Sequence, residues 1–268
     1  MRVLFIGDIV GRPGKHACGA LVPRLIRDRE LDCVIANAEN AAAGSGITPQ
    51  IFSKLRHQGV DACTLGDHIY KRYEAISLLE TSDRIVKPAN LPAVAAGRDH
   101  VIVPTRRGPQ IAVISLLGRT YMNMKADCPF AAVDRVLAAL PADVRLIFVD
   151  VHAETTSEKI ALGWYLDGRV TAVVGTHTHV QTADERVLPE GTAYITDLGM
   201  TGPYDSVLGR DKRNVIRSLI TCMPYPYDVA SNDVRLCGVM VEADSSTGRA
   251  IAIERVNLVD ETAGSDED

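Results

Sequence analysis

The stretch V-L-F-I-G-D-I-V-G-R-P-G-K-H, residues 3–16, contains the unit that decides the fold. Residues 3–6 form a short apolar run, which is typical of a buried strand. Gly7 follows and permits a sharp turn, so that the carboxylate of Asp8 lies at the carboxyl end of that strand. A helix is predicted soon afterwards, over residues 16–29. The beginning of the chain therefore predicts strand, glycine, acid and helix in that order.

The same order of strand and helix recurs further along the chain. More strands are predicted at residues 33–36, 62–65, 111–117, 146–151 and 171–174. Helices are predicted at residues 48–57, 73–80, 130–140 and, from a capping-box pattern at Thr155 and Glu158, 155–166. Short apolar strands that alternate with helices predict an α/β fold in which helices cover the faces of a sheet.

The last third of the chain has a different pattern. Short strands are predicted around residues 189–191, and a helix over residues 213–222. Residues 233–242 and 249–258 are joined by a turn-like segment, which predicts an antiparallel hairpin. We expect this hairpin in a second sheet, so that two sheets pack together with helices outside. Neither a repeat nor a linker interrupts the sequence, and we expect one domain over residues 1–259 and an acidic tail, 260–268.

Composition and charge are those of an ordinary globular protein. Hydrophobic residues make up 46% of the 268 residues and charged residues 24%, which excludes disorder for most of the chain. Five of the 34 acidic residues lie in the last nine positions, and the remaining 29 equal the 29 Lys and Arg residues. The body is formally neutral and lacks the basic stripe that binds duplex nucleic acid. We expect no duplex nucleic-acid partner and a solvated tail.

The cysteines and the N-terminal sequence indicate the compartment. The six cysteines contain no C-x-x-C motif and no spacing that would build a zinc site. Scattered thiols are typical of a reducing compartment. The apolar start is too short for a signal peptide, and no apolar run approaches the length of a membrane span. We therefore expect a cytoplasmic protein without a membrane partner.

Five predicted strands end in residues that bind metals or transfer protons. These ends are Gly7-Asp8, Asn37-Ala38-Glu39-Asn40, Gly66-Asp67-His68, His152 and Gly175-Thr176-His177-Thr178-His179. In α/β sheets functional residues gather at the carboxyl ends of strands. His177 and His179 are expected to address one site, because alternate residues of an extended segment point the same way.

Each of these residues also has a purely structural interpretation. Asp8 and Asp67 can cap a turn or a helix, and Glu39 can be a solvated loop acid. A lone histidine such as His152 is more often hydrogen-bonded within the protein than bound to a metal. The set as a whole favours a site, because independent caps and turns are not expected to place acids and histidines at so many converging strand ends.

Other chemistries find no support in the motifs. Gly14-Lys15 resembles the end of a P-loop, but Ile9 occupies the position of its first glycine and His16 follows the lysine. The sequence contains no G-x-S-x-G, H-E-x-x-H or G-x-G-x-x-G motif. The acids, amides and imidazoles instead suit two divalent transition-metal ions, since one ion would use about half of them. Two such ions support phosphoester hydrolysis, in which a spare histidine protonates the leaving oxygen.

These motifs resemble the ordered signature of the calcineurin-like metallophosphoesterases, D-x-H, G-D, G-N-H, H and G-H-x-H. The present chain keeps the order with changes: Val10 replaces the first histidine, Glu39 the second aspartate and Asp67 the asparagine. The changes are similar to those of one branch, the YmdB-like family. Stretches typical of that family are GDIVGRPG (7–14), KPANLP (87–92), HAETTSEK (152–159), GTHTHVQTAD (175–184) and TDLGMTGPYDSVLG (196–209).

The resemblance implies a fold and a metal site. The fold would be the calcineurin-like αββα sandwich, two mixed sheets flanked by helices. Glu39 would bridge two ions, iron or manganese, and His68 would be the general acid. The other ligands implied are Asp8, Asn40 and His179 for one ion and Asp67, His152 and His177 for the other.

The resemblance also implies an activity, and two rivals stay open beside it. The expected enzyme is a dinuclear phosphodiesterase that hydrolyses small phosphodiesters, 2',3'-cyclic nucleotides first, by attack of a metal-bridging hydroxide. The rivals are a phosphomonoesterase or nucleotidase with the same site, and a regulatory protein that acts through partner binding. Basic residues that could neutralise a phosphate are Lys71, Arg72, Arg119, Arg210 and Lys212. The sequence leaves the substrate contacts, the native metal and homo-oligomer formation open.

Overall fold

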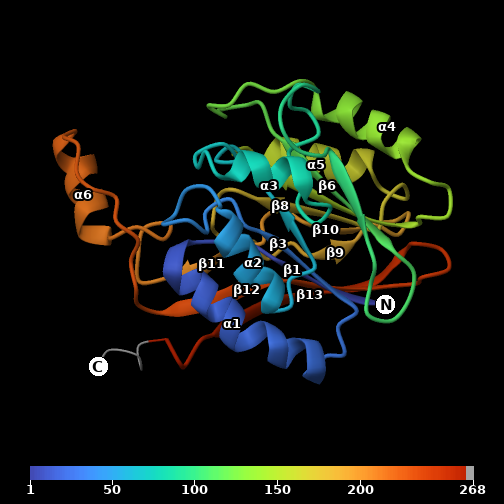
Figure 1. The fold of residues 1–268 in the computed structure, drawn as a ribbon, viewed down its shortest axis with the longest axis horizontal. Helices are drawn as coiled ribbons and strands as arrows, with labels where there is room; N and C mark the ends of the chain where they lie inside the picture. The colour runs from blue at the N-terminus through green and yellow to red at the C-terminus, as the bar shows by residue number, and fades with distance from the viewer. Residues whose placement is uncertain (264–268) are drawn as a thin grey trace.

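The computed structural model describes residues 1–263, in which two β-sheets pack face to face (Figure 1). The seven-stranded sheet has the order β2 (Asp8–Ile9), β11 (Met200–Pro203), β12 (Val234–Ala243), β1 (Arg2–Ile6), β3 (Cys33–Asn37) and β4 (Ala62–Thr64), with β13 (Ala250–Val259) paired to β12. The six-stranded sheet has the order β5 (His100–Val103), β6 (Ile111–Leu117), β7 (Leu146–His152), β8 (Ala172–Thr176), β10 (Ala193–Ile195) and β9 (Arg186–Val187).

Both sheets are mixed. Strands β1, β3 and β4 run parallel, as do β6, β7, β8 and β10. Antiparallel strands complete each sheet, at β12 and β13 in the first and at β5 and β9 in the second. The parallel strands bring the carboxyl ends of β3 and β4 to one end of the sandwich, where β7 and β8 also end.

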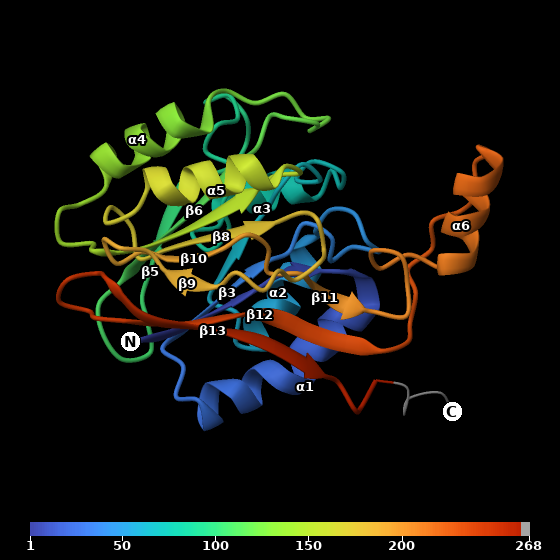
Figure 2. The ribbon, with the colours of Figure 1, turned by 180° about the vertical axis from the view of Figure 1, so that it is seen from behind.

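The helices form the two outer layers. Helices α1 (Gly11–Asp28), α2 (Pro49–His57) and α3 (Ala75–Thr81) share a core with the seven-stranded sheet. Helices α4 (Pro129–Ala139) and α5 (Thr156–Tyr165) share another with the six-stranded sheet. A third core lies between the sheets. Helix α6 (Lys212–Thr221) projects from the body in both views (Figures 1 and 2).

Strand β1 shows why the sequence forms these layers. Leu4 and Ile6 belong to the core under α1, whereas Val3 and Phe5 belong to the core between the sheets. Alternate residues of a strand point to opposite faces, so a strand in the middle of the sandwich is apolar on both. The unbroken apolar run that predicted this strand has that cause. The predicted αββα architecture is confirmed.

Helix α1 starts earlier than predicted, and helix α5 lacks its predicted capping box. Helix α1 begins at Gly11, earlier than the predicted His16, because Pro13 lies in the first turn, where backbone N–H groups have no partner within the helix. Helix α5 forms where expected, but its capping box does not. The Glu158 carboxylate accepts hydrogen bonds from the Thr155 hydroxyl and from the N–H groups of Arg119 and Thr120.

The predicted place of the closing hairpin is wrong. Strands β12 and β13 pair as expected, but β12 lies against β1 in the seven-stranded sheet, with Leu4 opposite Met240. The second sheet is made by the central part of the chain instead. Val239 and Val241 of β12 join the core between the sheets, next to Val3 and Phe5, so the hairpin widens the apolar face that β1 begins. Strands β2, β5 and β11 were not predicted.

The predicted solvated tail is also wrong at its first residue. Asp260 is 3% exposed, its N–H donates to the Val234 carbonyl, and its carboxylate lies 2.8 Å from Nδ1 of His16. Residues 264–268 of the predicted tail lie outside the described residues. Within residues 1–263, the structure contains no helix with the length and apolar character needed to span a membrane.

Candidate metal centre

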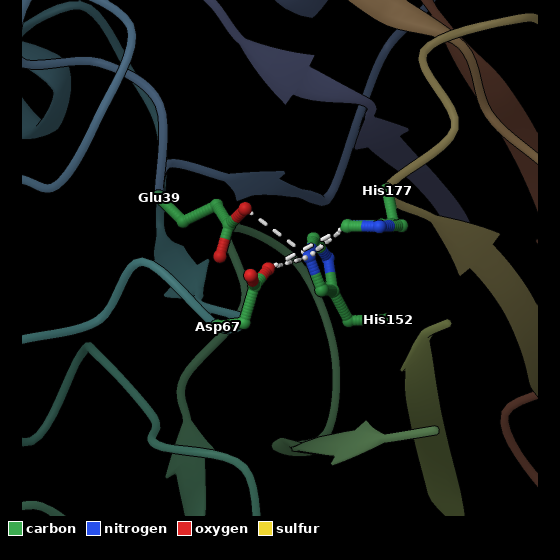
Figure 3. A group of neighbouring side chains, drawn as sticks. All are labelled: Glu39, Asp67, His152 and His177. Carbon is green, nitrogen blue, oxygen red and sulfur yellow. Dashed lines mark hydrogen bonds and ion pairs between the residues drawn. The ribbon is translucent and has the colours of Figure 1, made fainter. Parts of the chain in front are cut away.

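Four side chains from both sheets converge at the carboxyl ends of the strands (Figure 3). Glu39 follows β3, Asp67 follows β4, His152 ends β7 and His177 follows β8. His152 Nε2 lies 3.1 Å from Glu39 Oε1, 3.2 Å from Asp67 Oδ1 and 3.0 Å from His177 Nδ1. One ligand atom from each of the four lies within 4.8 Å of all the others, a spacing suited to a shared ion.

A second group lies directly beside the first. Asn40 Nδ2 is 3.2 Å from Glu39 Oε1, 3.3 Å from His179 Nε2 and 3.4 Å from Asp8 Oδ1. His179 Nε2 lies 3.7 Å from Asp8 Oδ1. All of the residues that the resemblance implied as ligands therefore meet in one cluster, and Glu39 contacts members of both groups.

The donor set of this cluster fits divalent cations. Asp8, Glu39 and His152 are at most 1% exposed, and no Lys or Arg within residues 1–263 forms an ion pair with Asp8, Glu39 or Asp67. Buried carboxylates are costly unless an opposite charge compensates them. A mixture of carboxylate, amide and imidazole ligands suits manganese, iron or zinc.

The cluster also shifts its own pKa values. Burial alone would raise the pKa of Glu39 and Asp67, but the neighbouring histidines, His152 foremost, together lower both. Burial would lower the pKa of His152, and Glu39 and Asp67 raise it well above its usual range. For His177, burial and the neighbouring His152 lower the pKa. The carboxylates are therefore held ionised, and a metal ion must displace a proton from His152.

Gly66 makes room for two of these residues. A Cβ at this position would lie 2.2 Å from Cδ2 of His152 and 2.4 Å from Oε2 of Glu39. Such distances are shorter than van der Waals contact, so a larger residue would push the imidazole or the carboxylate away. The glycine before Asp67 therefore has a packing reason, because it leaves room for the His152 ring and the Glu39 carboxylate.

The loop with His177 and His179 is not extended, contrary to the prediction. Both residues have left-handed backbone conformations, with φ of 95° and 64°. A non-glycine residue adopts this region at a cost that the surroundings must offset. Thr178, between the two histidines, donates its N–H and its hydroxyl to Asp197 Oδ2, at 3.2 and 2.7 Å. The loop thus directs both imidazoles to the cluster by its strained backbone.

Three residues that support this loop were missed in the sequence. Lys159 Nζ lies 2.6 Å from the same Asp197 oxygen. Glu154 Oε2 lies 3.2 Å from His177 Nε2, on the ring nitrogen that faces away from the cluster. Metal-bound histidines commonly donate their second N–H to a carboxylate. The H-A-E-T-T-S-E-K and T-D-L-G stretches contained these residues, but no spacing rule connects them to the histidine loop.

His68 lies at the edge of the cluster, outside the first group of four. Its Nδ1 is 2.7 Å from Asn40 Oδ1 and 3.6 Å from Glu39 Oε1, and its backbone N–H donates to Glu39 Oε2. The side chain is 31% exposed. His68 lines two hollows of about 290 and 390 Å³, and Glu39, His177 and His179 also line the first of these. A bound substrate can therefore reach this imidazole.

Two of the five basic candidates lie near the cluster. Arg210 lines the hollow over Glu39, where its guanidinium also donates to the carbonyls of Ala43 and Tyr227, and Lys71 lines the neighbouring hollow beside Asp67. The other three have different contacts. Arg72 donates to the carbonyls of Ala42 and Ser45, Lys212 pairs with Asp205, and Arg119 is exposed.

Similar proteins are known in sequence and in structure. A Bacillus subtilis (strain 168) protein named 2',3'-cyclic-nucleotide 2'-phosphodiesterase is 45% identical over 97% of this chain and 98% of its own. The crystal structure of a hypothetical protein from Thermus thermophilus is 41% identical, with a TM-score of 0.89 over 97% of this chain and 99% of that one. The crystal structure of a novel phosphatase from Mycoplasma pneumoniae is 32% identical, with a TM-score of 0.90 over 97% and 93%.

The family follows from these matches. The family model of the YmdB-like proteins matches residues 4–256, nearly all of the described chain. The two-sheet sandwich of this chain is the metallophosphoesterase fold of the M. pneumoniae phosphatase. The chain thus belongs to the YmdB-like protein family.

Proposed function

We propose that this protein is a metal-dependent phosphodiesterase that hydrolyses small phosphodiesters, 2',3'-cyclic nucleotides first. The observation that carries the proposal is the convergence of Asp8, Glu39, Asn40, Asp67, His152, His177 and His179 at one end of the sandwich. The name of the B. subtilis relative supports the substrate class. The scattered thiols support the cytoplasm as its compartment.

Two ions fit the cluster better than one. Asp8, Asn40 and His179 would hold one ion, and Asp67, His152 and His177 the other, with Glu39 shared. When bound, two such ions supply a nucleophilic water at neutral pH and neutralise charge on the phosphoryl group. Three carboxylates among the ligands favour iron or manganese as the native metal.

His68 is the residue we assign to proton transfer. Its Nδ1 faces Asn40, which leaves Nε2 as the ring nitrogen for a substrate. The imidazole lines the same hollow as Glu39, His177 and His179, so it can give a proton to the leaving oxygen of the phosphodiester. Arg210 and Lys71 lie in the two hollows that His68 lines and can offset the charge of a bound phosphate.

A panel of four substrates tests the proposal against its rivals. Protein reconstituted with Mn²⁺ is assayed with 2',3'-cyclic AMP, 3'-AMP, bis(4-nitrophenyl) phosphate and 4-nitrophenyl phosphate. We expect turnover of the two diesters, with 3'-AMP accumulating as the product of the cyclic nucleotide. Turnover of the monoesters alone would favour the nucleotidase. Metal binding without turnover of any of the four would favour a regulatory protein.

A further inference from the structure

A buried carboxylate lies behind the candidate metal centre. Asp150 is on β7, two residues before His152, and is 0% exposed. Its Oδ2 accepts hydrogen bonds from the Thr64 hydroxyl on β4 and from Asn37 Nδ2 on β3, and its Oδ1 accepts from the Thr176 hydroxyl on β8. The three donors come from both sheets, and no Lys or Arg within residues 1–263 pairs with this carboxylate.

The backbone N–H of Glu39 fixes the orientation of the Asn37 amide beside Asp150. The backbone N–H of Glu39 donates to Asn37 Oδ1 at 3.2 Å, so the amide nitrogen of Asn37 must face the other way. That nitrogen lies 3.1 Å from Asp150 Oδ2. Oδ2 of Asp150 therefore accepts from Asn37, and Oδ1 accepts from the Thr176 hydroxyl, the arrangement of an ionised carboxylate.

Thr176 connects Asp150 to the metal centre. Its Oγ1 lies 2.7 Å from Asp150 Oδ1 and 2.8 Å from His152 Nδ1. A hydroxyl has one proton, and two acceptors cannot share it at these distances. Because the carboxylate accepts, the Thr176 proton points to Asp150, and Nδ1 of His152 must donate to Thr176. The amide nitrogen of Asn37 is further from Nδ1, at 3.4 Å.

We propose that Asp150 is a positioning residue that acts through Thr176 to keep the proton of His152 on Nδ1. When a metal ion displaces the other ring proton, Nε2 is then the nitrogen that binds it, beside Glu39, Asp67 and His177. The inference rests on the proposed metal centre. A role confined to joining the sheets would need only the contacts with Thr64 and Asn37, neither of which links Asp150 to His152 by a short hydrogen bond.

Two threonine substitutions separate these roles. Thr176→Val and Thr64→Val each remove one hydroxyl from Asp150 and keep the volume of the side chain, but only the first breaks the link to His152. Mn²⁺ affinity is measured by competition with a chelator, and folding by thermal unfolding. We expect Thr176→Val to weaken binding of at least one ion by ~10- to 100-fold, the usual effect of losing an outer partner of a metal ligand. Thr64→Val, and Thr176→Ser, which restores the hydroxyl, should bind like the wild type.

A measurement on the wild type covers the case in which Thr176→Val does not fold. In zinc-loaded protein with ¹⁵N-labelled histidine, NMR reports which ring nitrogen of His152 bears the proton. The inference predicts Nδ1, and a proton on Nε2 would overturn it. Equal metal affinity of Thr176→Val and Thr64→Val would overturn the inference while leaving the metal centre intact. A wild type that binds no ion would overturn both the inference and the proposed function.

Discussion

Lys159 and Asp197 form an ion pair of 2.6 Å in which both side chains are only 1% exposed. The same Asp197 oxygen accepts both hydrogen bonds from Thr178, the residue between the two histidines of the metal centre. A buried charge pair thus holds the strained backbone that directs His177 and His179 to the cluster. Stability and metal binding are linked at this point.

Lys159→Met leaves the Asp197 carboxylate buried without its cation. Removing one partner of a buried pair costs about 3–5 kcal/mol, and we expect the free energy of unfolding to fall by that amount. We also expect metal content to fall, because the histidine loop loses its support. Urea unfolding and elemental analysis measure the two effects. Arg29→Met, which breaks the exposed pair with Glu254, is the control and should change stability by less than about 1 kcal/mol. Full metal content in Lys159→Met would show that the pair does not hold the loop.

Gly66→Ala places a methyl group where the His152 ring and the Glu39 carboxylate now lie. We expect this variant to fold but to retain less than one ion per chain, since both side chains must move. Gly19→Ala is a matched control in helix α1, where the new Cβ meets only the end of the flexible Gln58 side chain. Alanine there should keep the full metal content and stabilise the helix by up to about 1 kcal/mol. Equal metal content in the two variants would contradict the packing argument.

His68→Ala should leave metal content nearly unchanged and lower turnover by ~10²- to 10⁴-fold, the usual range for a positioned proton donor. The loss should be smaller for bis(4-nitrophenyl) phosphate than for 2',3'-cyclic AMP, because nitrophenolate leaves without a proton whereas a ribose oxygen does not. Loss of a metal ion would make His68 a ligand. Equal slowing of both substrates with full metal content would indicate that it orients the phosphate.

The raised pKa of Asp150 predicts that the stability of the metal-free protein depends on pH. Burial, only partly offset by His152 and by the Thr64 and Thr176 hydroxyls, raises the pKa of this carboxyl from 3.8 to about 6. The folded protein therefore binds the proton more tightly than the unfolded chain, and the contribution of Asp150 to stability falls as pH rises from about 4 to about 6. The total fall is on the order of 3 kcal/mol.

Asp150→Asn isolates this contribution. Urea unfolding of the wild type and of Asp150→Asn, both in excess chelator, is compared between pH 4 and pH 8. The difference in unfolding free energy should change between pH 4 and pH 6 and be constant above about pH 7. Two parallel curves over the whole range would show that the pKa of Asp150 is not raised.

The parts of the molecule that the sequence predicts are those with local causes. The largely apolar runs at β1, β3, β6 and β7 are buried on both faces, so a mostly apolar segment was sufficient to find them. Acids and histidines at the ends of such strands were sufficient to indicate one site, because parallel strands end at a common edge.

The features that the sequence did not predict depend on contacts between distant residues. The hairpin joins the seven-stranded sheet because β12 pairs with the edge of β1 that β3 leaves open. The residues of the hairpin do not indicate which strand they will pair with. Asp197 and Lys159 stabilise the left-handed backbone at His177 and His179. The prediction that these histidines alternate along an extended segment was therefore wrong. The sequence places Thr176 and Asp150 on different strands, and no spacing rule connects either of them to the ring of His152.

The metal content of the purified protein tests the central claim most directly. Elemental analysis after reconstitution with Mn²⁺ or Fe²⁺ should give close to two ions per chain, because the ligand set is too large for one. Glu39→Gln should lower this value more than any other single ligand change, since Glu39 contacts both groups. A wild-type content of no more than one ion per chain would contradict the account.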